Sequence, residues 1–254
     1  SPVLWYLTQH FLPKTFTLVE PGMTVSQQDA FYCTMFGLWA GFFIGYTTNY
    51  YTSGSYAPVQ KLAESCKQSA ATNVIQGISL GFYSTAIPVV FIALAIFFSF
   101  AYADMYGIAL AALGILSTMC IGLTIDAYGP IADNAGGIAQ MCDLGAEVRA
   151  NTDILDAAGN TTAAVGKGFA IGSACLVAVA LFGAFATETG LVVVNILKPL
   201  EFAGLVVGAM LPYLFTAMTM GAVGDAAQEM VIEIKRQFDE GGEPDYGKCI
   251  AIST

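Results

Sequence analysis

Five long apolar stretches in the chain limit what it can fold into. They lie at residues 30–50, 73–101, 105–128, 162–187 and 201–224. A helix needs roughly 20 mainly apolar residues to cross the hydrocarbon core of a bilayer. Each stretch is therefore predicted to be a membrane-spanning helix, and the more polar residues 225–240 are predicted to extend the last one into the cytoplasm. We assign the whole chain, residues 1–254, to a single transmembrane domain of the all-α class.

The composition excludes several other classes of protein. Of the 254 residues, 56% are apolar and only 11% are charged, whereas about 25% are charged in an ordinary soluble domain. So few charges could not cover the surface of a water-soluble globule, and so apolar a chain is not disordered. The net charge of -10 leaves no basic surface to neutralise phosphates, so a nucleic acid is excluded as a partner. The lipid bilayer is the first partner that the sequence predicts.

The basic residues give the orientation in the membrane. Because consecutive connections alternate between the two sides, the nine lysines and arginines can be assigned to a side. Seven fall on one side, namely Lys61, Lys67, Arg149, Lys167, Lys235, Arg236 and Lys248. Only Lys14 and Lys198 fall on the other. The positive-inside rule places the richer side in the cytoplasm.

Glycines recur at four-residue spacing in several of the apolar stretches. The glycines concerned are Gly37, Gly41 and Gly45 in the first stretch, Gly77 and Gly81 in the second, Gly168 and Gly172 in the fourth, and Gly204 and Gly208 in the fifth. Small residues at this spacing allow the backbones of membrane helices to approach closely. We interpret them as packing positions of a compact helix bundle.

Two sets of polar side chains lie at the cytoplasmic ends of the third and fourth stretches. Asp126 and Asp133 are seven residues apart, which places them on one helical face about 10.5 Å apart along the axis, although Pro130 between them should distort the helix. Asp153, Asp156 and Asn160 follow at i, i+3 and i+7 and also share a face.

Ionisable groups at membrane depth are costly and mark polar cavities. Carboxylates that face one cavity repel one another unless cations lie between them, and hard cations such as Mg²⁺ bind carboxylate and phosphate oxygens together. The two sets therefore predict a cytoplasmic site for a divalent metal and phosphate. Each acid also has a simpler explanation. Asp153 could lie in a capped first helical turn, Asp126 could end a span at the interface, and Asp133 could belong to a loop.

The same residues belong to long runs that resemble the membrane-integral pyrophosphatases, the proton- or sodium-pumping family. The runs DAYGPIADNAGGIA at 126–139 and LDAAGNTTAAVGKGFAIGSA at 155–174 are similar to two hallmark stretches of that family. YYTSGSYAPVQ at 50–60 and VGAMLPYLFTAMTMGAVG at 207–224 resemble it as well. The similarity covers residues 30–254.

The resemblance implies a homodimer with sixteen membrane helices per subunit, of which this chain would supply about five. Six inner helices surround magnesium pyrophosphate in such proteins, and the stretches 105–128 and 162–187 would be two of the six. Asp133 aligns with a magnesium-binding aspartate, and Asn160 aligns with an asparagine that contacts the metal and its water. These two residues are the candidate catalytic residues. Asp126, Asp153 and Asp156 complete the candidate metal set, in supporting or structural roles.

The resemblance also implies a potassium-dependent subclass. Potassium-independent members carry lysine at the position of Ala163, and the small residue at Gly166 accompanies potassium dependence. We therefore expect K⁺ as an activator beside Mg²⁺.

The activity that the resemblance implies is hydrolysis of pyrophosphate coupled to transport of a cation, which we expect to be the proton. The catalytic side should face the cytoplasm, and the membrane should be that of a vacuole or another acidic organelle. Because other acidic stretches of the family are absent, we expect the chain to be an internal fragment that is inactive alone. The residues by themselves leave open an ion-coupled secondary transporter or channel that uses intramembrane carboxylates. They also leave open a structural membrane subunit.

Overall fold

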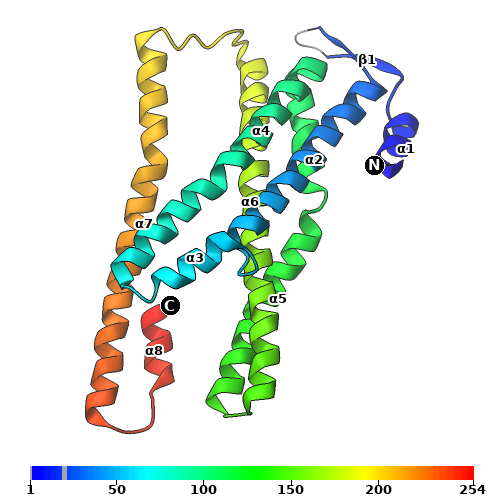
Figure 1. The fold of residues 1–254 in the computed structure, drawn as a ribbon. Coiled ribbons are helices and arrows are strands. Elements are labelled where there is room, and N and C mark those ends of the chain that lie inside the picture. Colours follow the sequence, from blue (N-terminus) through cyan, green and yellow to red (C-terminus); the bar gives the residue numbers. More distant parts are fainter. Residues whose placement is uncertain (1, 19–21) are drawn as a thin grey trace. The chain divides into compact units, whose positions relative to one another are not determined.

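The computed structural model describes residues 2–18 and 22–254. Contacts within the chain form two compact units, the first ending at Gly190 and the second running from Leu191 to Thr254. Each unit is described by itself. Most of the described residues are helical (Figure 1), so the predicted all-α helix-bundle class is confirmed.

The first unit opens with a short helix and a hairpin, and the hairpin was not predicted from the sequence. Helix α1 spans Pro2–Phe11, and strands β1 (Thr15–Thr17) and β2 (Thr24–Ser26) pair antiparallel. Strands of three residues are too short to show the alternating pattern on which strand prediction rests. Val25 of β2 is buried against Cys33 and Ala103, so the hairpin covers one end of the bundle.

Helix α2 (Gln27–Thr52) begins directly after the hairpin and includes the first predicted span. The Ser26 side chain accepts a hydrogen bond from the Asp29 backbone N–H, and the Asp29 carboxylate accepts one from the Ser26 N–H. This reciprocal capping box satisfies two backbone donors that the first helical turn would otherwise leave unpaired.

Helix α3 (Ala57–Ser65) leads into α4 (Ala70–Leu116), which contains a sharp reversal at Ala103 and Asp104. Both residues have non-helical backbone angles, and the chain turns back on itself there (Figure 1). The turn lies where the sequence places the boundary between its second and third spans. Ile44 of α2, Ile92 and Ile108 from the two arms of α4, and Leu176 of α6 form the core of this unit.

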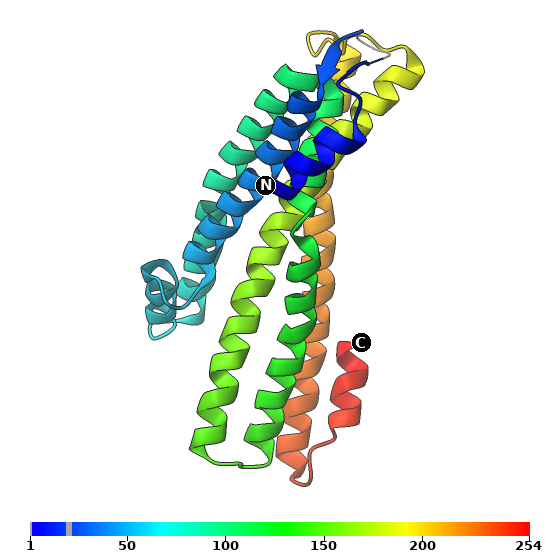
Figure 2. The ribbon, with the colours of Figure 1, turned by 90° about the vertical axis from the view of Figure 1, so that its right-hand side faces the viewer.

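Helix α5 (Met119–Met141) and helix α6 (Ala146–Thr189) form an antiparallel pair joined by a tight turn (Figure 2). The predicted third span, 105–128, is not one helix, because α4 ends at Leu116 and α5 starts at Met119. The helix also continues well past residue 128. Apolarity ends there, but a helix can continue through polar residues when they face a cavity, as Asp133 does. Pro130 lies inside α5, where it removes the N–H that would bond the Asp126 carbonyl.

Three described helices are long and apolar enough to cross a membrane by length and composition, namely α4, α6 and α7. Helix α2 has 26 residues and stays a predicted span, as does the part of the chain between Met105 and the middle of α5.

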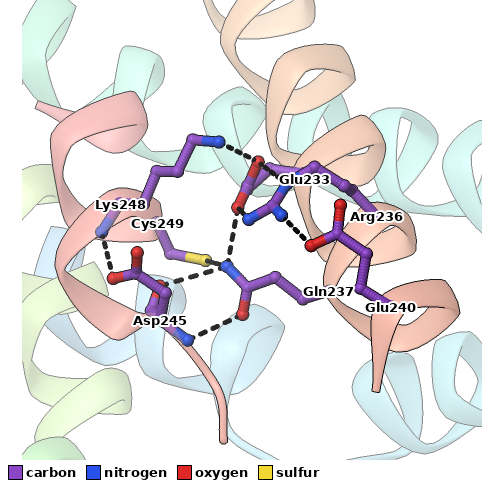
Figure 3. Close-up of polar contacts among 7 residues, drawn as sticks. All are labelled: Glu233, Arg236, Gln237, Glu240, Asp245, Lys248 and Cys249. Carbon is purple, nitrogen blue, oxygen red and sulfur yellow. Dashed lines mark hydrogen bonds and ion pairs between the residues drawn. The ribbon is translucent and has the colours of Figure 1, made fainter. Parts of the chain in front are cut away.

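The second unit consists of α7 (Pro199–Glu240) and α8 (Tyr246–Ser253). Helix α7 includes the predicted span 201–224 and the predicted extension 225–240 without a break. Near its end the Glu233 side chain, only 6% exposed, binds Arg236 of the same helix and Lys248 of α8 (Figure 3). Gln237 donates a third hydrogen bond to Glu233, so one carboxylate links the two helices.

Candidate functional site

The α5–α6 pair is held at backbone contact by glycines. A Cβ atom on Gly159 of α6 would lie 2.9 Å from the Gly129 Cα of α5, so only glycine fits this approach. The Tyr128 hydroxyl of α5 donates a hydrogen bond to the Leu155 carbonyl of α6 at 3.2 Å. These contacts place the two sets of polar side chains on adjacent helices, with Asp126 and Asp133 on α5 and Asp153, Asp156 and Asn160 on α6.

A cavity of about 430 Å³ lies beside the Gly129–Gly159 contact. Its lining consists of Asp126, Gly129, Pro130, Asp133, Asn134, Asn160, Ala163 and Lys167. The structure therefore brings together four of the seven residues that the sequence singled out, Asp126, Asp133, Asn160 and Ala163. The fifth, Gly166, lies against Asp126.

Asp126 carries a polar atom without a partner. Its Oδ1 atom is buried and has no hydrogen bond within the part of the chain that the structure describes. Leaving such an atom unsatisfied costs about 1–3 kcal/mol. The carboxylate faces Gly166, where a Cβ atom would lie 3.0 Å from Asp126 Oδ2. An unpaired carboxylate oxygen between a cavity and a glycine suits a cation, which would satisfy the oxygen.

Asn160 is oriented by Asp156. The Asn160 Nδ2 group donates to Asp156 Oδ1 at 2.9 Å, one helical turn away on α6. Because the amide nitrogen is used in this way, the amide oxygen of Asn160 is left as an acceptor for a metal ion or its water. Asp156 thus supports Asn160 and does not line the cavity itself.

Asp153 is engaged elsewhere. Its Oδ1 atom pairs with Arg149 Nη2 at 3.0 Å on the same helix, and it is absent from the cavity lining. The simpler explanations for Asp153 and Asp133 are wrong. Helix α6 begins at Ala146, so Asp153 is not in its first turn, and Asp126 and Asp133 both lie inside α5.

Among residues 2–18 and 22–254, no group of three or more histidine, cysteine, aspartate or glutamate side chains lies close enough to hold a metal ion. The five candidate metal residues therefore do not form a complete set of ligands here. The cavity offers two carboxylates, two amides and the ammonium of Lys167. Oxygens of this kind suit a hard cation that also carries phosphate oxygens, and a lysine binds phosphate as a point charge.

Sequence reasoning did not propose Lys167 or Asn134 for the site. The signal for Lys167 is its spacing, since it follows Asn160 by seven residues and so lies on the same helical face. Asp126 and Lys167 also line a second cavity of about 290 Å³ that extends to Thr118 at the break between α4 and α5.

Comparison with known proteins identifies the family. The sequence profile of the family described as "Inorganic H+ pyrophosphatase" matches residues 3–254. A putative K(+)-stimulated pyrophosphate-energized sodium pump of Clostridium tetani is 50% identical over 89% of this chain and 36% of its own length. A K(+)-insensitive pyrophosphate-energized proton pump of Methanosarcina mazei is 44% identical over 92% of this chain and 37% of its own. A K(+)-stimulated pyrophosphate-energized sodium pump of Thermotoga maritima is 39% identical over 98% of this chain and 37% of its own.

The chain thus spans about a third of the length of the curated relatives that it matches. The family match extends over nearly all of its residues, and it includes the α5–α6 pair and the cavity between the two helices. The chain belongs to the inorganic H⁺ pyrophosphatase family.

Proposed function

We propose that the chain is part of a membrane pump that hydrolyses inorganic pyrophosphate and couples this reaction to outward transport of protons. The observation that carries the proposal is the cavity in which Asp133, Asn160 and Lys167 meet between α5 and α6. Carboxylate and amide oxygens for a metal ion and an ammonium for phosphate are what magnesium pyrophosphate requires.

Mg²⁺ fits the residues that line the cavity. Asp133 and the oxygen of Asn160 would hold it, and Asp156 would keep the Asn160 amide turned correctly. Bound Mg²⁺ would stabilise the negative charge that develops on the phosphoryl group during hydrolysis. Because this chain supplies few ligands, the remaining ones would come from other parts of a protein as long as the relatives. Lys167 would bind a phosphate oxygen and hold the substrate in the cavity.

K⁺ is proposed as the activator, with Asp126, Ala163 and Gly166 forming its surroundings. Ala163 lines the same cavity as Asp126, and Gly166 lies directly against the Asp126 carboxylate, where a Cβ atom would be 3.0 Å from Oδ2. A lysine at position 163 would extend its ammonium into this cavity and could take the place of K⁺. The names of the relatives include both K(+)-stimulated and K(+)-insensitive pumps, so the position can be tested directly.

The remaining parts of the proposal concern the setting of the pump. The catalytic side faces the cytoplasm, since the basic residues favour that side. The assembly is a homodimer, and the membrane is that of a vacuole or another acidic organelle.

Phosphate release and proton transport by the full-length protein in sealed vesicles test the proposal. Wild-type protein should release phosphate from pyrophosphate only with Mg²⁺ and should acidify the vesicle interior. Asp133→Ala and Asn160→Ala should lower hydrolysis at least tenfold, as losses of metal-site residues commonly do. The control Glu147→Gln changes an exposed acid outside the cavity and should retain activity. A protein that moves ions down a gradient without hydrolysing pyrophosphate would be a secondary transporter or a channel.

The K⁺ assignment is tested by Ala163→Lys in the same vesicles. The variant should hydrolyse pyrophosphate equally well with and without K⁺. Retention of the wild-type response to K⁺ would show that the activating cation binds elsewhere.

A further inference from the structure

One side chain connects the two helices of the candidate site at their cytoplasmic ends. Arg149, in the first turns of α6, donates from Nη1 to the Gly136 carbonyl of α5 and pairs through Nη2 with Asp153 at 3.0 Å. The guanidinium therefore binds the backbone of one helix and a carboxylate of the other. The planar fork of the guanidinium makes the two contacts from two separate nitrogens in a fixed geometry, which a single ammonium nitrogen cannot reproduce.

Gly136 allows this contact to form. It is buried, and a Cβ atom there would lie 3.4 Å from Arg149 Nη1. A Cβ atom would thus already be in van der Waals contact with the guanidinium, and glycine leaves the Gly136 carbonyl open to Arg149. Thr152 also packs here, at 3.7 Å from the same Cβ position, and its hydroxyl donates to the Arg149 carbonyl at 2.9 Å. Arg149 is therefore held by contacts with both helices and does not extend freely into solvent.

The contact lies close to the proposed metal residues along both helices. Gly136 is three residues beyond Asp133 on α5, and Asp153 is seven residues before Asn160 on α6. Because helices are stiff over such distances, the axial register of α5 against α6 at Arg149 determines how Asp133 and Asn160 face each other. The Gly129–Gly159 contact sets the spacing of the helices, and the Tyr128 hydroxyl beside it donates one directional hydrogen bond to the Leu155 carbonyl. The Arg149 contact adds a second directional bond on the other side of Asp133, nearer the turn that joins the helices.

We propose that Arg149 is a positioning residue for the candidate site, and that Asp153 acts through Arg149 by orienting the guanidinium and does not bind metal. This assignment rests on the proposed function, and it changes the role expected for Asp153. Asp133 and Asn160 remain the groups that contact the metal, while the Arg149–Asp153 pair holds their helices in register.

The first test measures the Mg²⁺ concentration for half-maximal pyrophosphate hydrolysis by the full-length protein. Arg149→Gln should raise this concentration about tenfold, the lower end of what is seen when groups that orient metal ligands are lost. Asp153→Asn should shift it in the same direction by less. The double variant should be no worse than Arg149→Gln alone, because residues in one network are not additive. Additive losses would show that Asp153 acts independently of Arg149 and would overturn the proposal.

Two further variants separate a helix-internal ion pair from a contact between helices. Arg149→Lys keeps the charge but not the fork, and it should recover part of the Mg²⁺ affinity. The exchange of both residues, Arg149→Asp with Asp153→Arg, restores an i,i+4 pair but removes the donor from Gly136. It should remain as impaired as Arg149→Gln, and recovery of wild-type behaviour would overturn the proposal.

A readout that does not depend on activity is amide hydrogen exchange over residues 136–153. Arg149→Gln and Asp153→Asn should exchange faster there than the wild type, while the control Glu147→Gln should not. If the wild-type protein did not hydrolyse pyrophosphate, the proposed function would fail, yet this exchange would still decide the role of Arg149. Unchanged exchange in Arg149→Gln would refute the positioning role even in an active pump.

Discussion

Gly159 of α6 and Gly129 of α5 are in backbone contact, but the contact is not equivalent from the two sides. A Cβ atom added to Gly159 would lie 2.9 Å from the Gly129 Cα, whereas one added to Gly129 would lie 3.7 Å from the Gly159 carbonyl oxygen. The first distance is a clash with backbone and the second is ordinary van der Waals contact. The same methyl group should therefore have different effects at two glycines that face each other.

Gly159→Ala should push α5 and α6 apart and destabilise the full-length protein by about 1–3 kcal/mol, as overpacking usually does. It should also lower hydrolysis, because Asn160 is the next residue. Gly129→Ala should cost less. Gly137→Ala is the control, since its Cβ position has no atom within 4 Å in the described residues and alanine favours helix. Thermal unfolding of the three variants measures the order, and equal losses for Gly159 and Gly129 would contradict the geometry.

Gly37→Ala tests the packing of α2 against the second arm of α4. A Cβ atom on Gly37 would lie 1.8 Å from the Ala111 carbonyl oxygen, so the helices would have to separate. We expect a lower unfolding temperature and a destabilisation at least as large as that of Gly159→Ala. Gly81→Ala on α4 is the matched control, because no described atom lies within 4 Å of its Cβ position. A Gly37→Ala protein as stable as this control would show that α2 does not pack as described.

The sequence alone predicted the helical class, and it predicted much of the site because helical spacing is local. Asp126, Asp133 and Asn160 were placed on shared faces by counting residues, and the structure brings all three to one cavity. Of the predicted packing glycines, Gly37 and Gly168 are in tight contact with neighbouring helices, whereas no described atom lies within 4 Å of the Cβ position of Gly81. In these cases the 3.6-residue period is enough, because the side chains concerned lie on one helix or on two adjacent helices.

Helix boundaries and contacts between helices could not be predicted from the spacing of residues. The break between α4 and α5 interrupts a continuous apolar run, so hydropathy gives no sign of it. The Arg149–Asp153 pair has the local i,i+4 spacing of one helix, but the hydrogen bond from Arg149 to the Gly136 carbonyl depends on where α5 ends and on the tight turn that follows. The helical spacing and the family resemblance, which placed Asp153 in the candidate metal set in a supporting or structural role, give no sign of the contact that Arg149 makes with α5.

Two substitutions of Asp104 test the backbone conformation at the reversal inside α4. The Asp104 φ of 51° is combined with a ψ of -146°, a backbone conformation that strains every residue except glycine. The Asp104 carboxylate accepts a hydrogen bond from the Met105 N–H at 2.6 Å, which compensates for part of this cost. Asp104→Ala loses the bond and keeps the strain, whereas Asp104→Gly loses the bond and relieves the strain. We expect the glycine variant to be more stable than the alanine variant by about 1 kcal/mol, measured by thermal unfolding. The reverse order would rule out the positive φ.

Glu233 should make the contact between α7 and α8 resistant to mild acid. Hydrogen bonds from Arg236, Lys248 and Gln237 hold the pKa of the Glu233 carboxyl well below its usual range. An ordinary glutamate has a pKa of about 4.3 in an unfolded chain. A carboxyl whose pKa is lowered by folding stabilises the folded state fully above that ordinary value. The stabilisation is lost only as the pH falls towards the lowered pKa.

Amide hydrogen exchange of α8, corrected for the intrinsic rate at each pH, measures this contact in the full-length protein. The wild type should keep α8 protected between pH 7 and pH 5 and lose protection gradually below the ordinary glutamate pKa. Glu233→Gln cannot form the ion pairs with Arg236 and Lys248, so its α8 should exchange faster than that of the wild type between pH 7 and pH 5 and show little further change in acid. The control Glu243→Gln alters an exposed acid for which no ion pair is found among the described residues, and it should follow the wild type. A Glu233→Gln protein whose α8 kept wild-type protection at pH 7 would contradict the linking role of this carboxylate.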